Sequence, residues 1–137
     1  MAVKGRAWLV LVATSLGLGT PLTGQTQGAR TTLDGVYTSE QAALGRQTYQ
    51  RVCSECHSLD YYSGATIRPW AGADVYSMYN LIRTQMPQNN PGSLRPREYV
   101  AMIAYILELN GMPAGGEALS SRRSELQSIV FKWTDEG

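Results

Sequence analysis

Apolar residues recur along most of the chain at intervals of three and four, which predicts helices rather than strands. In the first such segment, Ser39 is placed to cap a helix that runs to about Cys53. One face of this helix carries Ala42, Gly45 and Tyr49. Glycine in mid-helix costs up to about 1 kcal/mol relative to alanine. We therefore expect another part of the backbone to approach the helix closely at Gly45.

Two more helices are predicted further along the chain. Asp74 caps the first of them, which ends before Met86-Pro87 because a residue preceding proline is pushed out of the helical region. Pro96 suits the first position of the other, which the turn at 110–111 ends. Their apolar stripes consist of Val75, Met78, Tyr79 and Ile82, and of Val100, Ile103, Ala104 and Leu107. No segment alternates as a strand does, so the predicted class is all-α with three main helices.

The last part of the chain, residues 112–137, has a fourth apolar stripe. Its members, at positions i, i+3, i+4 and i+7, are Leu126, Ile129, Val130 and Trp133. This spacing predicts a short amphipathic helix. Such a helix either straps across the domain or docks on a partner protein, in which case the stripe is exposed in the free monomer.

The first residues are typical of a secretory signal peptide. Lys4 and Arg6 precede the apolar stretch 7–18, and a turn-prone segment at 20–24 follows. A helix of that length rises only about 18 Å, whereas a hydrocarbon core is about 30 Å thick. We expect residues 1–24 to be cleaved, with cuts near Gly28 or Ala29 as alternatives, and the mature chain not to insert in a membrane. Residues 25–36 are expected to form a flexible segment.

Composition excludes several function classes. The chain has 137 residues, 12 Lys and Arg, 11 Asp and Glu, two cysteines and one histidine. Removal of residues 1–24 takes away Lys4 and Arg6 and leaves 10 basic and 11 acidic side chains. Without a basic surplus, nucleic acid is not an expected partner. Two cysteines make no disulfide scaffold, and the length allows one domain and a compact cofactor site.

One motif indicates a particular cofactor. Cys53-Ser54-Glu55-Cys56-His57 has the CxxCH pattern of covalent haem attachment. Two cysteines three apart on a helical turn lie side by side, so each thiol can form a thioether with one haem vinyl group, and His57 can supply an axial nitrogen to the iron. A redox CxxC would need a βαβ setting, a zinc site would need further ligands, and a local disulfide would leave His57 without a role.

The chain from Tyr37 to Gly111 resembles a class I cytochrome c domain, most closely the small monohaem bacterial cytochromes, some of which accompany periplasmic dehydrogenases. The features that carry the resemblance are Gly45 and Tyr49 ahead of Cys53, the CxxCH motif, Pro-x-x-Gly at 69–72, and Met-Pro before a last helix with Tyr105. The resemblance implies a cytochrome c fold around one covalently bound haem c, with the first and last helices crossing near Gly45. It also implies that the Pro69 carbonyl accepts a hydrogen bond from His57 Nδ1. Weaker candidates for contacts with the haem propionates are Arg68, Trp70, Arg83 and Arg95.

The second axial ligand has several candidates, because no second histidine exists. We prefer Met86, since Pro87 ends the helix there and holds Met86 in an extended loop from which its thioether can project toward the iron. Met78 and Met102 lie on helical stripes, where a core role is ordinary. Met112 is the rival, because Met112-Pro113 repeats the dipeptide, but family order places the ligand before the last helix. An open or water-bound iron is the remaining alternative.

These observations predict a periplasmic electron carrier and no enzyme. Its partners would be a redox protein donor and acceptor, such as a dehydrogenase, another cytochrome or an oxidase. One alternative is a cytochrome subunit held tightly in a periplasmic dehydrogenase complex, with the C-terminal stripe buried in the partner. Another is an enzyme or gas sensor, which would require that Met86 does not coordinate.

Overall fold

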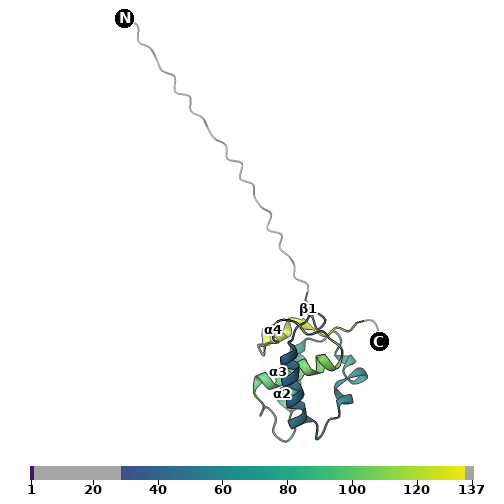
Figure 1. Ribbon diagram of the computed structural model, residues 1–137. Coiled ribbons are helices and arrows are strands. Elements are labelled where there is room, and N and C mark those ends of the chain that lie inside the picture. The colour runs from purple at the N-terminus through teal and green to yellow at the C-terminus, as the bar shows by residue number, and fades with distance from the viewer. Residues whose placement is uncertain (2–28, 135–137) are drawn as a thin grey trace.

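The protein is described here from a computed structural model, which covers Met1 and residues 29–134 (Figure 1). The predicted signal peptide, apart from Met1, and the first part of the expected flexible segment lie outside the described residues. The described chain is mostly helical, as the sequence predicts. No helix within it is both long and apolar enough to span a membrane.

The first helix, α1, spans Ser39–Thr48 and continues directly into η1, a π-helical turn at Tyr49–Cys53. The cap is Thr38 rather than Ser39, because Thr38 is still extended and its side chain accepts a hydrogen bond from the Gln41 amide at 3.2 Å. The predicted helix therefore reaches Cys53, but its last turn is wider than an α-helical turn. Such π-turns are rare and are frequently found at functional sites.

The next two helices have the predicted ends. Helix α2 spans Val75–Gln85, and the Asp74 side chain accepts a hydrogen bond from the Ser77 amide at 2.9 Å. It ends at Met86, whose backbone is extended at φ −124° and ψ 150°. Helix α3 spans Pro96–Leu109, starts on its proline and ends at Asn110. Short 3-10 turns lead from the CxxCH motif to α2, namely η2 (Leu59–Tyr62), η3 (Gly64–Thr66) and η4 (Arg68–Trp70).

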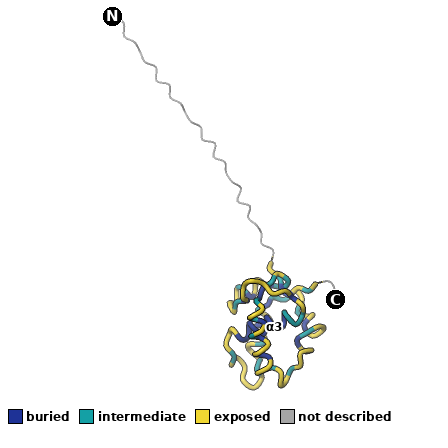
Figure 2. The backbone as a smooth tube through the Cα atoms, in the orientation of Figure 1, coloured by how far each residue is buried: buried dark blue, intermediate teal, exposed yellow. Residues whose placement is uncertain are grey.

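Helix α3 forms the centre of the molecule, and α1 crosses it (Figures 1 and 2). Every residue of α3 from Glu98 to Leu107 is buried. At the crossing, a Cβ atom on Gly45 would lie 1.9 Å from the Ala101 carbonyl oxygen and 2.7 Å from the Tyr105 Cβ. The close backbone approach predicted at Gly45 is thus confirmed. Tyr49 and Tyr105 contact each other beside the crossing, with ring centroids 5.9 Å apart.

The C-terminal tail departs from its predicted form. Helix α4 spans only Arg123–Gln127, and the chain then extends into β2, Ile129–Val130. The single helix predicted for the stripe is therefore wrong. The Phe131 amide donates to the Ala73 carbonyl and its carbonyl accepts from the Gly72 amide, both at 2.9 Å, and these bonds favour an extended backbone. Ile129 and Phe131, two residues apart, are both buried on one side, as in a strand.

The tail packs on its own domain. Leu119, Leu126, Ile129 and Phe131 are all at least 95% buried. We call residues 119–133 the strap. Figure 1 shows the strap, in yellow, at the edge of the molecule together with the start of the described chain.

Residues 30–36, expected to belong to a flexible segment, are held by the strap. Strand β1, Arg30–Thr31, pairs in parallel with β2 in the register Arg30 to Ile129 and Thr31 to Val130. The buried Thr32 hydroxyl donates to the Lys132 carbonyl at 2.9 Å and accepts from the Lys132 amide at 3.0 Å. The described part of this segment is therefore ordered by hydrogen bonds to residues about a hundred positions away, which no local pattern reveals.

Candidate functional site

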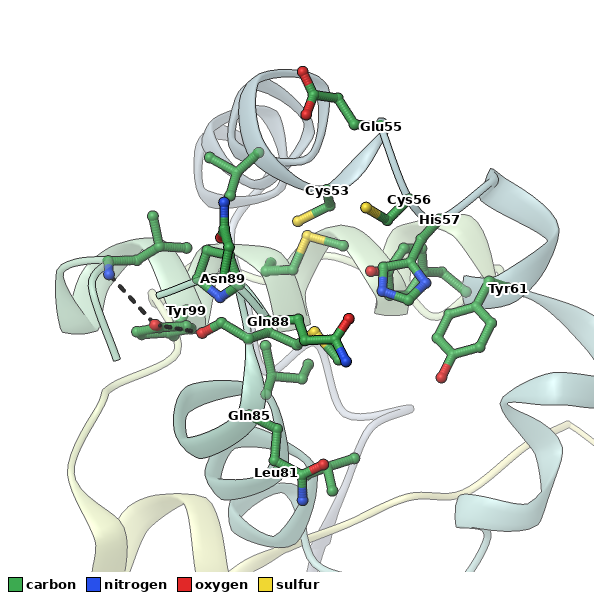
Figure 3. A pocket seen from close by; sticks show the side chains of 17 residues that line it. Cys53, Glu55, Cys56, His57, Tyr61, Leu81, Gln85, Gln88, Asn89 and Tyr99 are labelled. Carbon is green, nitrogen blue, oxygen red and sulfur yellow. Dashed lines mark hydrogen bonds between the residues drawn. The ribbon is translucent and has the colours of Figure 1, made fainter. Parts of the chain in front are cut away.

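A cavity of about 590 Å³ opens between the CxxCH turn, the end of α2, the loop 86–94 and α3 (Figure 3). Its apolar wall includes Val52, Leu81, Ile82, Leu94 and Met102. The four residues expected from the sequence to hold a cofactor, Cys53, Cys56, His57 and Met86, all line it. The tertiary structure thus brings Met86 to the same space as the motif.

The motif folds as a tight turn that ends η1. The amides of Cys56 and His57 both donate to the Cys53 carbonyl, at 3.2 Å and 2.9 Å. Cys53 is half-buried and Cys56 is exposed. Figure 3 shows both sulfur atoms and the His57 ring along one side of the cavity. The two thiols and the imidazole are therefore presented together, with Cys53 inside and Cys56 nearer to solvent.

The surroundings of Cys53 keep its thiol protonated. Burial raises the pKa of Cys53, and the hydrogen bond with the Tyr62 phenol and the positive charge of Arg51 offset this only in part. The pKa of Tyr62 is also raised, chiefly by burial and next by Cys53. A buried thiol with a raised pKa is a poor nucleophile in exchange reactions. This environment disfavours a reactive redox CxxC, against which the absence of a βαβ setting already argues.

Tyrosines surround His57. Its carbonyl accepts a hydrogen bond from the Tyr49 hydroxyl at 2.8 Å, which ties the motif to the start of η1. The His57 ring stacks on Tyr61 with centroids 4.5 Å apart and meets Tyr62 edge-on at 5.8 Å. In the described structure, no hydrogen bond joins His57 to the Pro69 carbonyl, and Pro69 does not line the cavity.

The four methionine candidates differ in whether they line the cavity. Met78 and Met112 are buried at 2% and 4% exposure and do not line the cavity. Met86 and Met102 do line it. Met102 lies in the middle of α3, as the helical stripe predicts, whereas Met86 lies in extended chain immediately after α2. The rival Met112 has its carbonyl bonded by the Tyr37 hydroxyl at 2.7 Å and contributes nothing to the wall of the cavity.

Sequence reasoning missed the role of Tyr99 in the site. Its hydroxyl donates to the Met86 carbonyl at 2.9 Å and accepts from the Leu94 amide at 3.3 Å (Figure 3). Tyr99 also lines the cavity and is 1% exposed. In the sequence it is one apolar position near the start of a helix, and nothing in the periodicity distinguishes a hydroxyl that bonds to a loop.

Glu98 supplies a carboxylate in the first turn of α3, as the sequence indicates, but its burial and its ion pairs were not predicted. Glu98, 5% exposed, accepts hydrogen bonds from Arg51 Nη2 at 2.6 Å, Arg95 Nε at 3.1 Å and the Arg95 amide at 2.9 Å. The bonds from Arg95, and then that from Arg51, lower the pKa of Glu98 to about 2. This ionised group joins η1, which carries Cys53, to the start of α3. Arg95, one of the four candidates for contacts with the haem propionates, is therefore bonded to Glu98. None of the four candidates lines the cavity.

The donor set fits a haem better than a bare metal ion. No group of three or more His, Cys, Asp or Glu side chains within the described residues is arranged to hold a metal. What the cavity offers is one imidazole, methionine sulfur, two thiols at its edge and apolar walls. A porphyrin supplies four equatorial nitrogens itself and needs axial ligands and apolar surroundings. The volume is also within the range of about 300–1,000 Å³ usual for small-molecule sites.

Residues 40–106 match the family model described as cytochrome C oxidase, cbb3-type, subunit III. The matched stretch begins in α1 and ends in α3, and every residue that lines the cavity lies within it. Comparison with curated proteins and with solved structures gives no match. The strap and residues 30–36 lie outside the match, so they are additions to the part of the chain that the family describes.

Proposed function

We propose that the protein is a periplasmic monohaem cytochrome c that carries single electrons between redox proteins, and the match of residues 40–106 to a cytochrome family model supports this. The observation that carries the proposal is that Cys53, Cys56, His57 and Met86 line one cavity. One CxxCH motif in the sequence supports one haem c per chain.

Each of these residues has a role in the proposal. Cys53 and Cys56 hold the haem through thioether bonds, His57 is the proximal iron ligand and Met86 is the distal ligand. The haem, when bound, supplies a reversible one-electron change of its iron. A thioether opposite imidazole favours reduced iron and a high potential. The remaining apolar walls, including Leu81, surround the cofactor. Because the haem itself carries the electron, no side chain needs to carry out bond chemistry.

Two observations bear on the alternatives. A tightly bound subunit was expected to bury its C-terminal stripe in a partner, but Leu126 and Ile129 are buried within this chain. That packing supports a self-contained carrier, although the matched family takes its name from a subunit of an oxidase. An enzyme or sensor requires an open iron, and the extended backbone of Met86 at the cavity supports a closed one.

The proposed location and partners rest on sequence. The pattern of residues 1–24 supports export, and covalent haem attachment in bacteria takes place outside the cytoplasm. The donor and the acceptor are then periplasmic or membrane-bound redox proteins, such as a dehydrogenase, another cytochrome or an oxidase, which dock transiently. Surfaces for such contacts are small, about 1,200 Å² or less in total.

Optical spectroscopy of the mature chain tests the ligands. The protein is made in a host with cytochrome c maturation machinery, as wild type, Met86→Leu and Met102→Leu. We expect haem that remains attached after denaturation, and a sulfur-to-iron charge-transfer band in the oxidised wild type. This band should be lost in Met86→Leu and kept in Met102→Leu, which alters a second methionine of the same cavity.

Other outcomes would point elsewhere. A band that is lost in Met102→Leu and kept in Met86→Leu would move the distal ligand to α3. A high-spin spectrum in the wild type, with ready binding of small ligands, would indicate an open iron and favour an enzyme or a sensor. Haem that is extracted by denaturation would contradict attachment through Cys53 and Cys56.

A further inference from the structure

We propose that Tyr99 is a positioning residue that holds the loop 86–94 closed, and with it the Met86 side chain, over the cavity. The inference rests on the proposed function, because it concerns the distal ligand of that site. Tyr99 does not touch the iron in this proposal. It acts through the backbone of the loop.

The hydroxyl of Tyr99 connects the two ends of the loop. It donates to the carbonyl of Met86, the first residue, and accepts from the amide of Leu94, the last. One oxygen atom on α3 thus bridges backbone groups eight positions apart in the chain. Because Tyr99 is 1% exposed and belongs to the central helix, its oxygen is a fixed point against which the loop is held.

Beyond the packing of Leu94 against the core, the loop has few hydrogen bonds to hold it. Its own hydrogen bonds are short-range, from Asn90 to the Pro87 carbonyl at 2.9 Å, from Gly92 to the Met86 carbonyl at 3.3 Å and from Ser93 to the Asn90 carbonyl at 3.3 Å. Residues 88–93 are all exposed. Among the described hydrogen bonds of residues 87–94, the bond to Tyr99 is the one that reaches outside the loop and Met86.

Loss of this oxygen should loosen the loop without disturbing the core. Tyr99→Phe keeps the ring, which meets Tyr79 edge-on with centroids 6.4 Å apart. It leaves a part-buried carbonyl and a part-buried amide with one partner fewer. A net hydrogen bond of ordinary strength shifts an equilibrium by roughly three- to tenfold. The state in which Met86 has left the iron should become more populated by that factor.

Tyr79→Phe is the matched control. Tyr79 is a neighbouring tyrosine, 6% exposed, on α2, and its hydroxyl makes no hydrogen bond to loop 86–94 in the described structure. The change removes the same atom from the same aromatic cluster. Any general cost of deleting a tyrosine hydroxyl from this cluster therefore appears in both variants, whereas a cost specific to the loop appears only in Tyr99→Phe.

The experiment measures imidazole binding to the oxidised protein, where imidazole must displace Met86. We expect Tyr99→Phe to bind imidazole roughly three- to tenfold more tightly than wild type, with a weaker sulfur-to-iron band, and Tyr79→Phe to match wild type. A second measurement does not depend on ligand exchange. Amide hydrogen exchange of Leu94 in the reduced protein should be faster in Tyr99→Phe, while exchange in the middle of α3 stays slow in all three proteins.

The outcomes separate the two proposals. Equal imidazole affinity and equal Leu94 exchange in Tyr99→Phe and wild type, with the band present in both, would overturn the role of Tyr99 and leave Met86 ligation standing. Equal loosening in Tyr79→Phe and Tyr99→Phe would also overturn it, because the effect would then belong to the core. Absence of the sulfur-to-iron band from the wild type would overturn Met86 ligation, and the positioning role with it.

Discussion

At the scale of single residues, Gly45 and Cys53 show two ways in which one residue determines where the site lies. Gly45 has no Cβ, and that absence lets α1 and α3 touch backbone to backbone. Cys53 lies at the end of the π-helical turn that continues α1. The position of the motif relative to α3 therefore depends on the crossing that Gly45 allows.

Gly45→Ala should be severely destabilising. The added Cβ would lie 1.9 Å from the Ala101 carbonyl oxygen, a backbone atom that cannot move aside alone. Forcing extra atoms into a packed core usually costs about 1–3 kcal/mol, and we expect at least the upper end here. Urea unfolding of the haem protein measures the loss of unfolding free energy.

Gly116→Ala is the control for this prediction. A Cβ at Gly116 meets no atom within 4 Å, so its unfolding free energy should stay within about 0.5 kcal/mol of wild type. Equal unfolding midpoints for Gly45→Ala and Gly116→Ala would mean that the helices can separate at little cost, contrary to the close crossing.

At the scale of elements, the strap holds the chain that leads from the motif to α2. Phe131 bonds through its backbone to Gly72 and Ala73, which lie just ahead of Asp74, the cap of α2. Its ring is 1% exposed and lies 6.3 Å from that of Trp70, centroid to centroid. The strap thus fixes the C-terminal end of the segment that leads from His57 to α2.

Phe131→Ala should destabilise the free monomer by about 3–5 kcal/mol, the usual cost of deleting a buried phenylalanine side chain. The unfolding free energy from urea titration, with the spectrum as a check on haem ligation, measures the effect. Lys132→Ala is the matched control, because Lys132 is the next residue of the strap and is exposed. If Phe131→Ala left the monomer as stable as Lys132→Ala does, the strap would not stabilise the free domain, and docking on a partner protein would be favoured instead.

At the scale of the whole molecule, the fold encloses a cavity that its own side chains do not fill. The walls come from η1, α2, the loop 86–94 and α3, so the packing of these elements on the side of the cavity depends on what occupies it. Helices α1 and α3 cross elsewhere, at Gly45, and the strap is bonded to α1 through Leu119 and Gln41. Once the haem is withheld, we therefore expect the walls of the cavity to be less stable than the part formed by the α1–α3 crossing and the strap.

The variant Cys53→Ala with Cys56→Ala should be much less stable than the haem protein. Without attached haem, the apolar walls that include Ile82 and Leu94 face water, so we expect Tm to fall by more than about 10 °C. Thermal unfolding followed by circular dichroism measures this, with Ser54→Ala as a control that keeps both thiols. An unchanged Tm in the cysteine variant would show that the helices and the strap alone supply the stability.

Much of the fold follows from short-range signals. Asp74, Pro87 and Pro96 act on their own turns, through a side-chain cap, a restricted preceding residue and a missing amide donor, so the ends of α2 and α3 could be predicted. The CxxCH motif is equally local, because attachment needs only residues within one turn. Gly45 was informative for a related reason, since a costly mid-helix glycine indicates a close contact without naming its partner.

Long-range contacts decided the rest. The stripe from Leu126 to Trp133 has helical spacing, yet hydrogen bonds to Gly72, Ala73 and the start of the described chain draw its second half into a strand. Met86 and Met102 reach the cavity whereas Met78 and Met112 do not, which depends on how α2 and α3 pack. The bond from Tyr99 to the Met86 loop and the pairing of Glu98 with Arg51 likewise join residues from different elements. Local patterns therefore specified the helices and the cofactor motif, because each depends on a few neighbouring residues. The cavity, the strap and the bracing of Met86 required the tertiary structure, because they arise only when distant segments compete for the same contacts.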